Sequence, residues 1–286
     1  MSRYRTDRLL TLYWFHPLLR TFGGKGLSKI PILMYHSISC QPEGNRHSYF
    51  ELNTAPEVFA LQMAYLKNTG YRVIGLAEAV DLVCGLRGRE ENRNDRYAVL
   101  TFDDGFRDFH ERAHPELHRS GFSATVFLPT GYTQADRRVF EGKECLTWDE
   151  VRFLAAAGVQ FGSHTVTHDM LVEMEPERIK RELRQSKDEI ERETGKDVHY
   201  FSYPYRYPEQ DRAFLCQFES LLARTGYRAA VSTRIGTVKK GDNIYSLKRI
   251  PVNSHDDLPL FRAKLEGGYD WLHRVQYWKK RLRPRA

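Results

Sequence analysis

Residues 97–105 read YAVLTFDDG, and this stretch decides the fold class. Residues 97–102 form a continuous apolar run, which is typical of a strand buried on both faces in a parallel sheet. Asp103 and Asp104 follow at once. In parallel α/β folds, functional residues gather where strands end and loops begin. The stretch therefore predicts a buried parallel strand with a polar site at its carboxyl end.

A second strand end carries two imidazoles. Residues 159–168 read VQFGSHTVTH, so His164 and His168 follow an expected strand at residues 159–161. Two histidines and one carboxylate are a common ligand set for zinc, and a second carboxylate can act as a base. Each piece alone is weak evidence, because Asp-Asp-Gly is a frequent turn sequence. The same four-residue spacing of histidines also occurs at residues 110, 114 and 118, where we interpret it as a solvated helix face.

Strands and helices alternate along the rest of the chain. Strands are expected at residues 30–38, 122–128, 199–203, 229–232 and 245–250, and helices at residues 56–71, 76–86, 110–120, 149–157, 176–194 and 213–225. Residues 88–95 are expected to form a charged loop. Regular alternation favours a parallel α/β architecture, open or closed into a barrel. We expect one α/β domain over residues 30–255.

Basic charge is concentrated at the ends of the chain, in a segment of residues 1–29 and another of residues 256–286. The net charge is +7, but residues 1–30 alone carry +5 and residues 271–286 carry +6, which leaves −4 for the residues between them. A nucleic-acid reader normally has its positive charge on the folded surface that meets the duplex. We therefore expect no nucleic-acid partner.

Both terminal segments mix cations with aromatic and aliphatic side chains. Such sequences suit the headgroup region of an anionic membrane, so peripheral membrane contact is one hypothesis. The alternative, which we prefer at this stage, is short helices packed on the domain, with Trp14 and Trp271 as anchors. No stretch has the roughly 18–20 apolar residues that a membrane-spanning helix needs.

The cysteines and the N-terminus bear on the cellular compartment. The apolar run at residues 9–15 is short and is followed by His16 and Pro17, which makes a poor secretion signal. The four cysteines are irregularly spaced and form no CxxC pair, which fits a reducing compartment. We expect a cytoplasmic protein, and under the membrane hypothesis its contact would be with the inner membrane surface.

The conjunction of motifs resembles the polysaccharide deacetylase family, the carbohydrate esterases with a NodB homology domain. The phrases that carry the resemblance are PILMYHSI at residues 31–38, LTFDDGF at 100–106, GSHTVTH at 162–168 and FSYPYR at 201–206. The resemblance covers roughly residues 30–253. It implies a distorted (β/α) barrel and a metal-dependent hydrolase that removes N-acetyl groups from N-acetylhexosamine units of a polysaccharide or glycan precursor.

The resemblance also implies a role for each matching residue. Asp104, His164 and His168 would bind the metal, and Asp103 would be the general base. The Tyr205 amide, next to Pro204, would stabilise the oxyanion. Zinc is the expected metal for this ligand set, although cobalt, nickel or manganese can bind the same geometry.

Two departures from the family pattern concern the base and the acid. Many members have an arginine that orients the base where this chain has Ser202, and Arg206 or Arg249 could replace it. We also find no late Leu-x-His motif to supply a general acid. The poly-N-acetylglucosamine deacetylase branch tends to lack that arginine and uses the histidine of a YH pair that ends the first strand. His36 matches this position, so the chain is most similar to that branch and His36 is the expected general acid.

Two other functions remain open at this stage. The same scaffold could hydrolyse another C–N bond, such as that of a cyclic amide. It could also be a catalytically silent glycan-binding module. A cytoplasmic location would favour a lipid-linked or short glycan over an exported polymer.

Overall fold

The structure is a computed structural model that describes residues 5–22, 29–41, 43–44, 47–86, 96–273 and 275. The charged loop expected at residues 88–95 lies outside the described residues. Among the helices described, none is long and apolar enough to cross a lipid bilayer.

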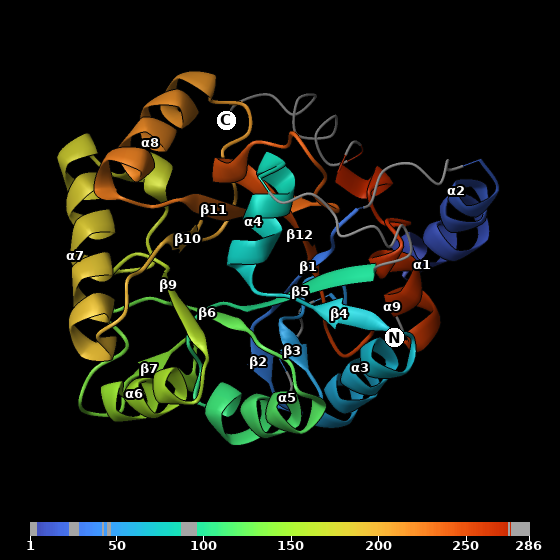
Figure 1. Cartoon of the computed structure of the whole chain (residues 1–286), viewed down its shortest axis with the longest axis horizontal. Coiled ribbons are helices and arrows are strands. Elements are labelled where there is room, and N and C mark those ends of the chain that lie inside the picture. Colours follow the sequence, from blue (N-terminus) through green and yellow to red (C-terminus); the bar gives the residue numbers. More distant parts are fainter. Residues whose placement is uncertain are drawn as a thin grey trace.

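Seven parallel strands close into a barrel (Figure 1). The ring runs in the order β1-β12-β11-β10-β9-β6-β5, and β5 pairs back with β1 in the register Ile32 to Val99 through Tyr35 to Phe102. The strands are β1 (Ile32–Tyr35), β5 (Arg96–Phe102), β6 (Thr125–Leu128), β9 (Gln160–Ser163), β10 (Tyr200–Ser202), β11 (Ala229–Ile235) and β12 (Leu247–Pro251). The expected α/β barrel in a single domain is confirmed.

Short strands add to this ring. β4 (Tyr71–Val73) pairs with the first residues of β5. Two small sheets lie apart from the barrel sheet, one of β2 (Ser37–Ile38) with β3 (Asn53–Thr54) and one of β7 (Val139–Phe140) with β8 (Lys143–Glu144). The β7–β8 hairpin contributes residues to the pocket at the carboxyl ends of the barrel strands.

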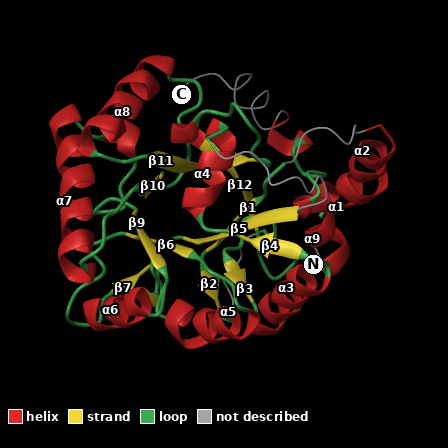
Figure 2. Ribbon diagram, viewed as in Figure 1, coloured by secondary structure: helices red, strands yellow, loops and turns green. Residues whose placement is uncertain are grey.

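Helices surround the barrel, as the ribbon view shows (Figure 2). They are α3 (Pro56–Asn68), α4 (Leu76–Cys84), α5 (His114–Ser120), α6 (Trp148–Ala156), α7 (Pro176–Thr194), α8 (Arg212–Thr225) and α9 (Leu258–Leu265). A π-helical turn, η2 (Phe109–Ala113), leads into α5, and the 3-10 turns η3 (Leu171–Glu173) and η4 (Ile244–Ser246) lie in loops. The helices expected from hydrophobic spacing are confirmed, with boundaries that shift by a few residues.

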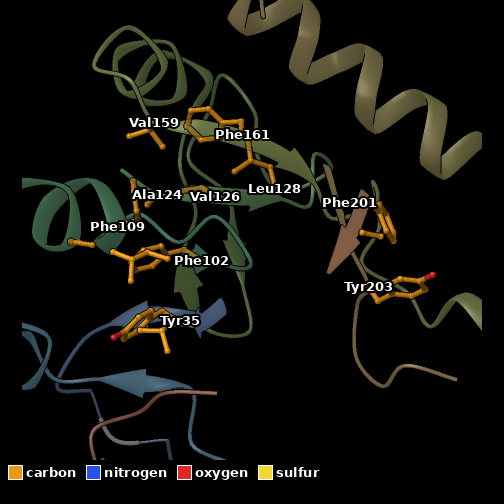
Figure 3. Close-up of a cluster of buried hydrophobic side chains, with 14 of the residues drawn as sticks. Tyr35, Phe102, Phe109, Ala124, Val126, Leu128, Val159, Phe161, Phe201 and Tyr203 are labelled. Carbon is orange, nitrogen blue, oxygen red and sulfur yellow. The ribbon is translucent and has the colours of Figure 1, made fainter. Parts of the chain in front are cut away.

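The core has two layers because alternate side chains of a strand point to opposite faces. In the outer layer, the Phe102 ring lies 5.2 Å from the ring of Tyr35 and 4.8 Å from that of Phe109 (Figure 3). Ile32 and Val99 belong to a second cluster, which is continued by the buried face of α4. Along β5, every second side chain points into the barrel. Thr101 and Asp103 belong to this inward-facing set, so the strand directs the Asp103 carboxylate into the barrel.

The terminal segments pack on one another through polar groups. The N-terminal helical segment consists of α1 (Thr6–Leu10), the π-helical η1 (Thr11–Phe15) and α2 (His16–Phe22), and η1 contacts α9. Its buried residues are Asp7, Thr11 and His16. Trp271 stacks on Phe15 with the ring centroids 4.4 Å apart and donates a 3.1 Å hydrogen bond to Thr11, as expected of an anchor. The expectation that Trp14 is a second anchor is wrong, because Trp14 is 65% exposed.

A buried ion network fixes this packing. Asp256 accepts hydrogen bonds from Arg5 (Nη1 to Oδ1, 3.0 Å) and from Lys264 (Nζ to Oδ2, 2.6 Å), and all three side chains are at most 8% exposed. Tyr269 and Arg5 in turn donate hydrogen bonds to Asp7. The terminal helices are therefore joined to the barrel by largely buried ion pairs.

Replacing Asp256 by alanine should destabilise the protein by about 3–5 kcal/mol, because it leaves the buried Lys264 without its anion and removes one of the two carboxylates that bind Arg5. The change is measured as a lower urea midpoint. Asp188→Ala is the matched control, since Asp188 is exposed and lies 3.9 Å from Arg184 on α7. That control should change the unfolding free energy by less than about 0.5 kcal/mol. Equal stability of the two variants would contradict the importance of the network.

Candidate active site

The carboxyl ends of the parallel strands bring the predicted site residues into one pocket. Asp103 and Asp104 follow β5, His164 follows β9, and His36 follows β1. These residues line a pocket of about 330 Å³ together with His168, Met34, Leu52, Phe140, Glu141, Tyr203, Tyr205 and Thr233. The four residues that follow strand ends therefore line the same pocket as His168.

Asp104, His164 and His168 form a compact buried triad. The Asp104 Oδ1 atom lies 3.5 Å from His164 Nε2 and 3.3 Å from His168 Nε2, and the two Nε2 atoms lie 3.2 Å apart. Ligand atoms about 2.0–2.2 Å from a tetrahedral zinc are separated from each other by about 3.3–3.6 Å. The observed separations match this spacing, so the three side chains can hold a metal ion.

Hydrogen bonding and charge prepare the triad for a cation. The His164 Nδ1 atom donates to the Ser202 carbonyl at 2.8 Å, which orients the ring so that Nε2 is on the Asp104 side and available as a metal ligand. Burial lowers the pKa of His164, but the Asp104 and Asp103 carboxylates outweigh it and raise the pKa above its ordinary value. Burial raises the pKa of Asp104, but its bonds to His164 and His168 hold it well below the usual range. The site therefore attracts positive charge.

Glu182 of α7 holds the loop that carries His168. Its carboxylate accepts hydrogen bonds from the backbone amides of Val166 (2.7 Å) and Thr167 (3.0 Å). Opposite this loop, the Gly131 amide donates a 2.9 Å bond to the Val166 carbonyl. A Cβ at position 131 would lie 2.7 Å from that carbonyl oxygen, so the loops approach this closely only because residue 131 is glycine.

Arg249 is the cationic partner of Asp103, a role that a serine at position 202 cannot fill. Its guanidinium donates two 2.7 Å hydrogen bonds, one to each carboxylate oxygen of Asp103, and it is 1% exposed. The same guanidinium also donates to the Ser202 hydroxyl at 3.0 Å. Of the two candidate arginines, Arg249 on β12 therefore occupies this role, while Arg206 is exposed.

This ion pair keeps Asp103 ionised. Burial raises the pKa of Asp103, but the Arg249 guanidinium, with smaller contributions from His164 and His36, lowers it below its ordinary value. Charged, bidentate pairs of this kind also fix the carboxylate plane. Asp103 is thus presented to the pocket as an oriented carboxylate.

The remaining predicted residues lie around this pair. His36 Nε2 lies 4.0 Å from Asp103 Oδ2, and burial lowers the pKa of His36 although both carboxylates oppose the shift. The imidazole is therefore neutral at neutral pH. The Tyr205 ring packs edge-on against His168 with ring centroids 4.7 Å apart. Within the described part of the chain, the Tyr205 amide donates no hydrogen bond to another protein group, and Pro204 has no amide hydrogen to donate.

Backbone strain is concentrated at the pocket. The described non-glycine residues with positive φ are Asp104 (69°), Glu141 (49°), Thr165 (67°), His168 (60°) and Tyr205 (52°). Four of these five line the pocket, and Thr165 lies in the loop between the two histidines. Such conformations cost about 1–3 kcal/mol each and persist where the surroundings impose them, commonly at functional sites.

Two parts of this site, Glu182 and Phe140, were not predicted from the sequence, and a third, Arg249, was only one of two candidates. Glu182 is a carboxylate on the buried face of α7, and a charge among the apolar positions of a helix was its only signal. Phe140, in the unpredicted β7–β8 hairpin, packs on His168 with ring centroids 4.8 Å apart. Arg249 was named as a candidate, but its contact with Asp103 joins residues 146 positions apart and needed the structure.

Comparison with known proteins agrees with this geometry. Residues 90–229 match the polysaccharide deacetylase family. The chain is 28% identical over 242 residues to YxkH of Bacillus subtilis (strain 168), whose name assigns it provisionally to the polysaccharide deacetylases, covering 84% of this chain and 77% of that protein. The chain therefore carries a domain of the polysaccharide deacetylase family, as the motifs indicated.

Two further relatives extend the comparison. Poly-beta-1,6-N-acetyl-D-glucosamine N-deacetylase of Escherichia coli (strain K12) is 33% identical over 114 residues, which cover 36% of this chain and only 16% of that enzyme. Among solved structures, Streptococcus pyogenes deacetylase PplD in complex with acetate superposes with a TM-score of 0.70 at 26% identity, covering 83% of this chain and 98% of that one. The structural similarity therefore extends over nearly the whole of the PplD chain.

Proposed function

We propose that the protein is a metal-dependent hydrolase that removes N-acetyl groups from N-acetylhexosamine units of a glycan. The observation that carries the proposal is the oriented, ionised Asp103 beside a triad spaced for a metal ion. A carboxylate held by a buried arginine next to such a triad suits the activation of water for attack on an amide. Membership of the deacetylase family supports the same chemistry.

Each residue of the site has its own role in the proposed reaction. Asp104, His164 and His168 would hold the ion, most suitably zinc, which when bound supplies Lewis-acid activation of water and of the amide carbonyl. Asp103 accepts the proton of the attacking water, and Arg249 keeps its carboxylate ionised and in place. The Tyr205 amide donates to the oxygen on which negative charge develops.

His36 completes the proton balance. The leaving amine needs a proton when the C–N bond breaks, and a neutral imidazole can first accept one and then donate it. His36 Nε2 is 4.0 Å from Asp103 Oδ2, so a small movement would allow a proton to pass from the Asp103 carboxyl to His36. We therefore assign His36 as the general acid, which is reloaded by way of Asp103.

Acetate release from N-acetylglucosamine oligomers tests the proposed reaction, with a cyclic ureide as the competing substrate class. We expect acetate release from the oligomers and no opening of the ureide. Ureide hydrolysis without acetate release would assign the site to another C–N bond. Tight oligomer binding without turnover of either compound would indicate a silent glycan-binding module.

Loss of one ligand should remove the metal. His168→Gln is expected to lower zinc affinity by more than about 100-fold, since changes in outer-shell partners alone cost 10–100-fold. The matched control is His114→Gln, because His114 also has a histidine four residues away but lies on α5 with its ring 6.3 Å from that of His118. Calorimetric zinc titration measures both variants. Equal affinities would exclude the triad as the metal site.

A further inference from the structure

The N-terminal helical segment (Thr6–Phe22) presents an apolar face to the outside of the molecule. Its exposed side chains include Tyr13 at 70%, Trp14 at 65% and Phe22 at 79% exposure. Leu10, Trp14, Leu18 and Phe22 recur every four residues, so they follow one side of the helix. Large apolar residues gathered in one exposed stripe mark interaction surfaces in most proteins.

The segment is held in this orientation by its polar side. Asp7 and Thr11 face inward to hydrogen-bond with Tyr269 and Trp271, and His16 Nε2 lies 2.7 Å from the Glu266 carboxylate. The usual pattern is the reverse, with apolar residues inward and polar residues outward. The outward apolar stripe is therefore a consequence of specific buried contacts and is not the exposed end of a loosely packed helix.

We propose that this stripe docks the protein on the surface of an anionic lipid bilayer. Tryptophan and tyrosine combine an apolar ring with a polar group and favour the boundary between headgroups and acyl chains. A helix with leucine and aromatic residues on one face can lie in that boundary without crossing the membrane. The stripe has this composition, and the cations for an anionic surface come from Arg20 and from the sequence that follows Trp271.

The sequence supplies those cations at both ends of the chain. Arg20 is exposed on the same segment. Trp271 stacks on Phe15, and the sequence continues from it to five basic residues between positions 279 and 285. Each lysine or arginine near an anionic surface strengthens the attraction to that surface. Anionic lipids are characteristic of cytoplasmic leaflets, so the proposal agrees with the compartment expected from the cysteines.

Vesicle sedimentation of the full chain tests the proposal. We expect binding to vesicles of phosphatidylcholine mixed with phosphatidylglycerol, and much weaker binding to phosphatidylcholine alone or at high salt. The double variant Trp14→Ser/Phe22→Ser should lose about tenfold or more in vesicle affinity, because it removes two large apolar side chains from the contact. Its acetate-releasing activity on soluble oligomers should stay unchanged.

A matched double variant separates the stripe from general hydrophobicity. Leu61→Ser/Phe153→Ser removes exposed apolar side chains (55% and 58%) from α3 and α6, and should bind vesicles like the parent protein. Trp14→Phe should retain binding but lose most of the blue shift in tryptophan emission. Equal vesicle binding by the parent and the Trp14/Phe22 variant would overturn the proposal. So would self-association of the parent that this variant abolishes, with no vesicle binding by either.

Discussion

Asp103→Asn is expected to lower kcat for acetate release by about 10²–10⁴-fold, which is the usual contribution of a general base. Asparagine has the same shape but cannot accept the proton of the attacking water. Its amide hydrogens would also face the Arg249 guanidinium, where the carboxylate now accepts two 2.7 Å hydrogen bonds. Steady-state kinetics on N-acetylglucosamine oligomers measures the loss.

The control for this variant is metal binding. Asp103 is not part of the Asp104–His164–His168 triad, so zinc affinity should change by no more than a few-fold. Ser202→Ala is a useful companion, since the Ser202 hydroxyl lies 3.3 Å and 3.4 Å from the two Asp103 oxygens and should matter much less. An Asp103→Asn enzyme with parental kcat would show that another group is the base.

Arg249→Met is expected to lower kcat/KM by roughly 100-fold near neutral pH, with partial recovery at higher pH. Arg249 now holds the pKa of Asp103 below its ordinary value, while burial acts in the opposite direction. Without Arg249 the burial effect dominates and the pKa of Asp103 rises. Because the base works only when ionised, the acidic limb of the pH–rate profile should move to higher pH.

Folding controls accompany this prediction, because removing one partner of a buried ion pair costs about 3–5 kcal/mol. Arg249→Lys keeps the charge but loses the two-point contact, so its profile should shift less than that of Arg249→Met. Arg228→Met removes an arginine that pairs with Asp81 on the surface and should leave the profile unchanged. An unshifted acidic limb in folded Arg249→Met would contradict the positioning role.

The barrel could be predicted from sequence because its strands are continuous apolar runs and its helices have regular apolar spacing. The buried run at β5 and the nineteen residues of α7 are long enough for their patterns to be clear. β4 was missed because it has three residues, of which one is buried, so no alternation is visible. The β7–β8 hairpin was missed because each strand has two residues.

The site could be assembled from sequence only as far as local motifs reach. Strand ends identify His36, Asp103 and His164, because parallel strands bring their carboxyl ends to one edge of the barrel. Arg249 and Glu182 act across the fold, and each looks in sequence like an ordinary charged residue of a strand or helix. The strained backbone at Asp104 and His168 is equally invisible, because aspartate and histidine usually have negative φ.

The terminal segments show where hydrophobic patterning gives the wrong prediction. Apolar spacing alone would bury Leu10, Trp14 and Leu18 against the barrel. The structure instead buries Asp7, because Arg5 and Tyr269 satisfy its carboxylate away from water. Partners so distant in sequence cannot be read from the segment itself.

Metal dependence is tested most directly by measuring acetate release by metal-stripped protein before and after zinc is restored. We expect no release from N-acetylglucosamine oligomers without metal and full release once about one zinc is bound per chain. Release at an undiminished rate by the metal-free protein would contradict a metal-dependent deacetylase. So would stoichiometric zinc binding that produces no acetate from any N-acetylhexosamine oligomer.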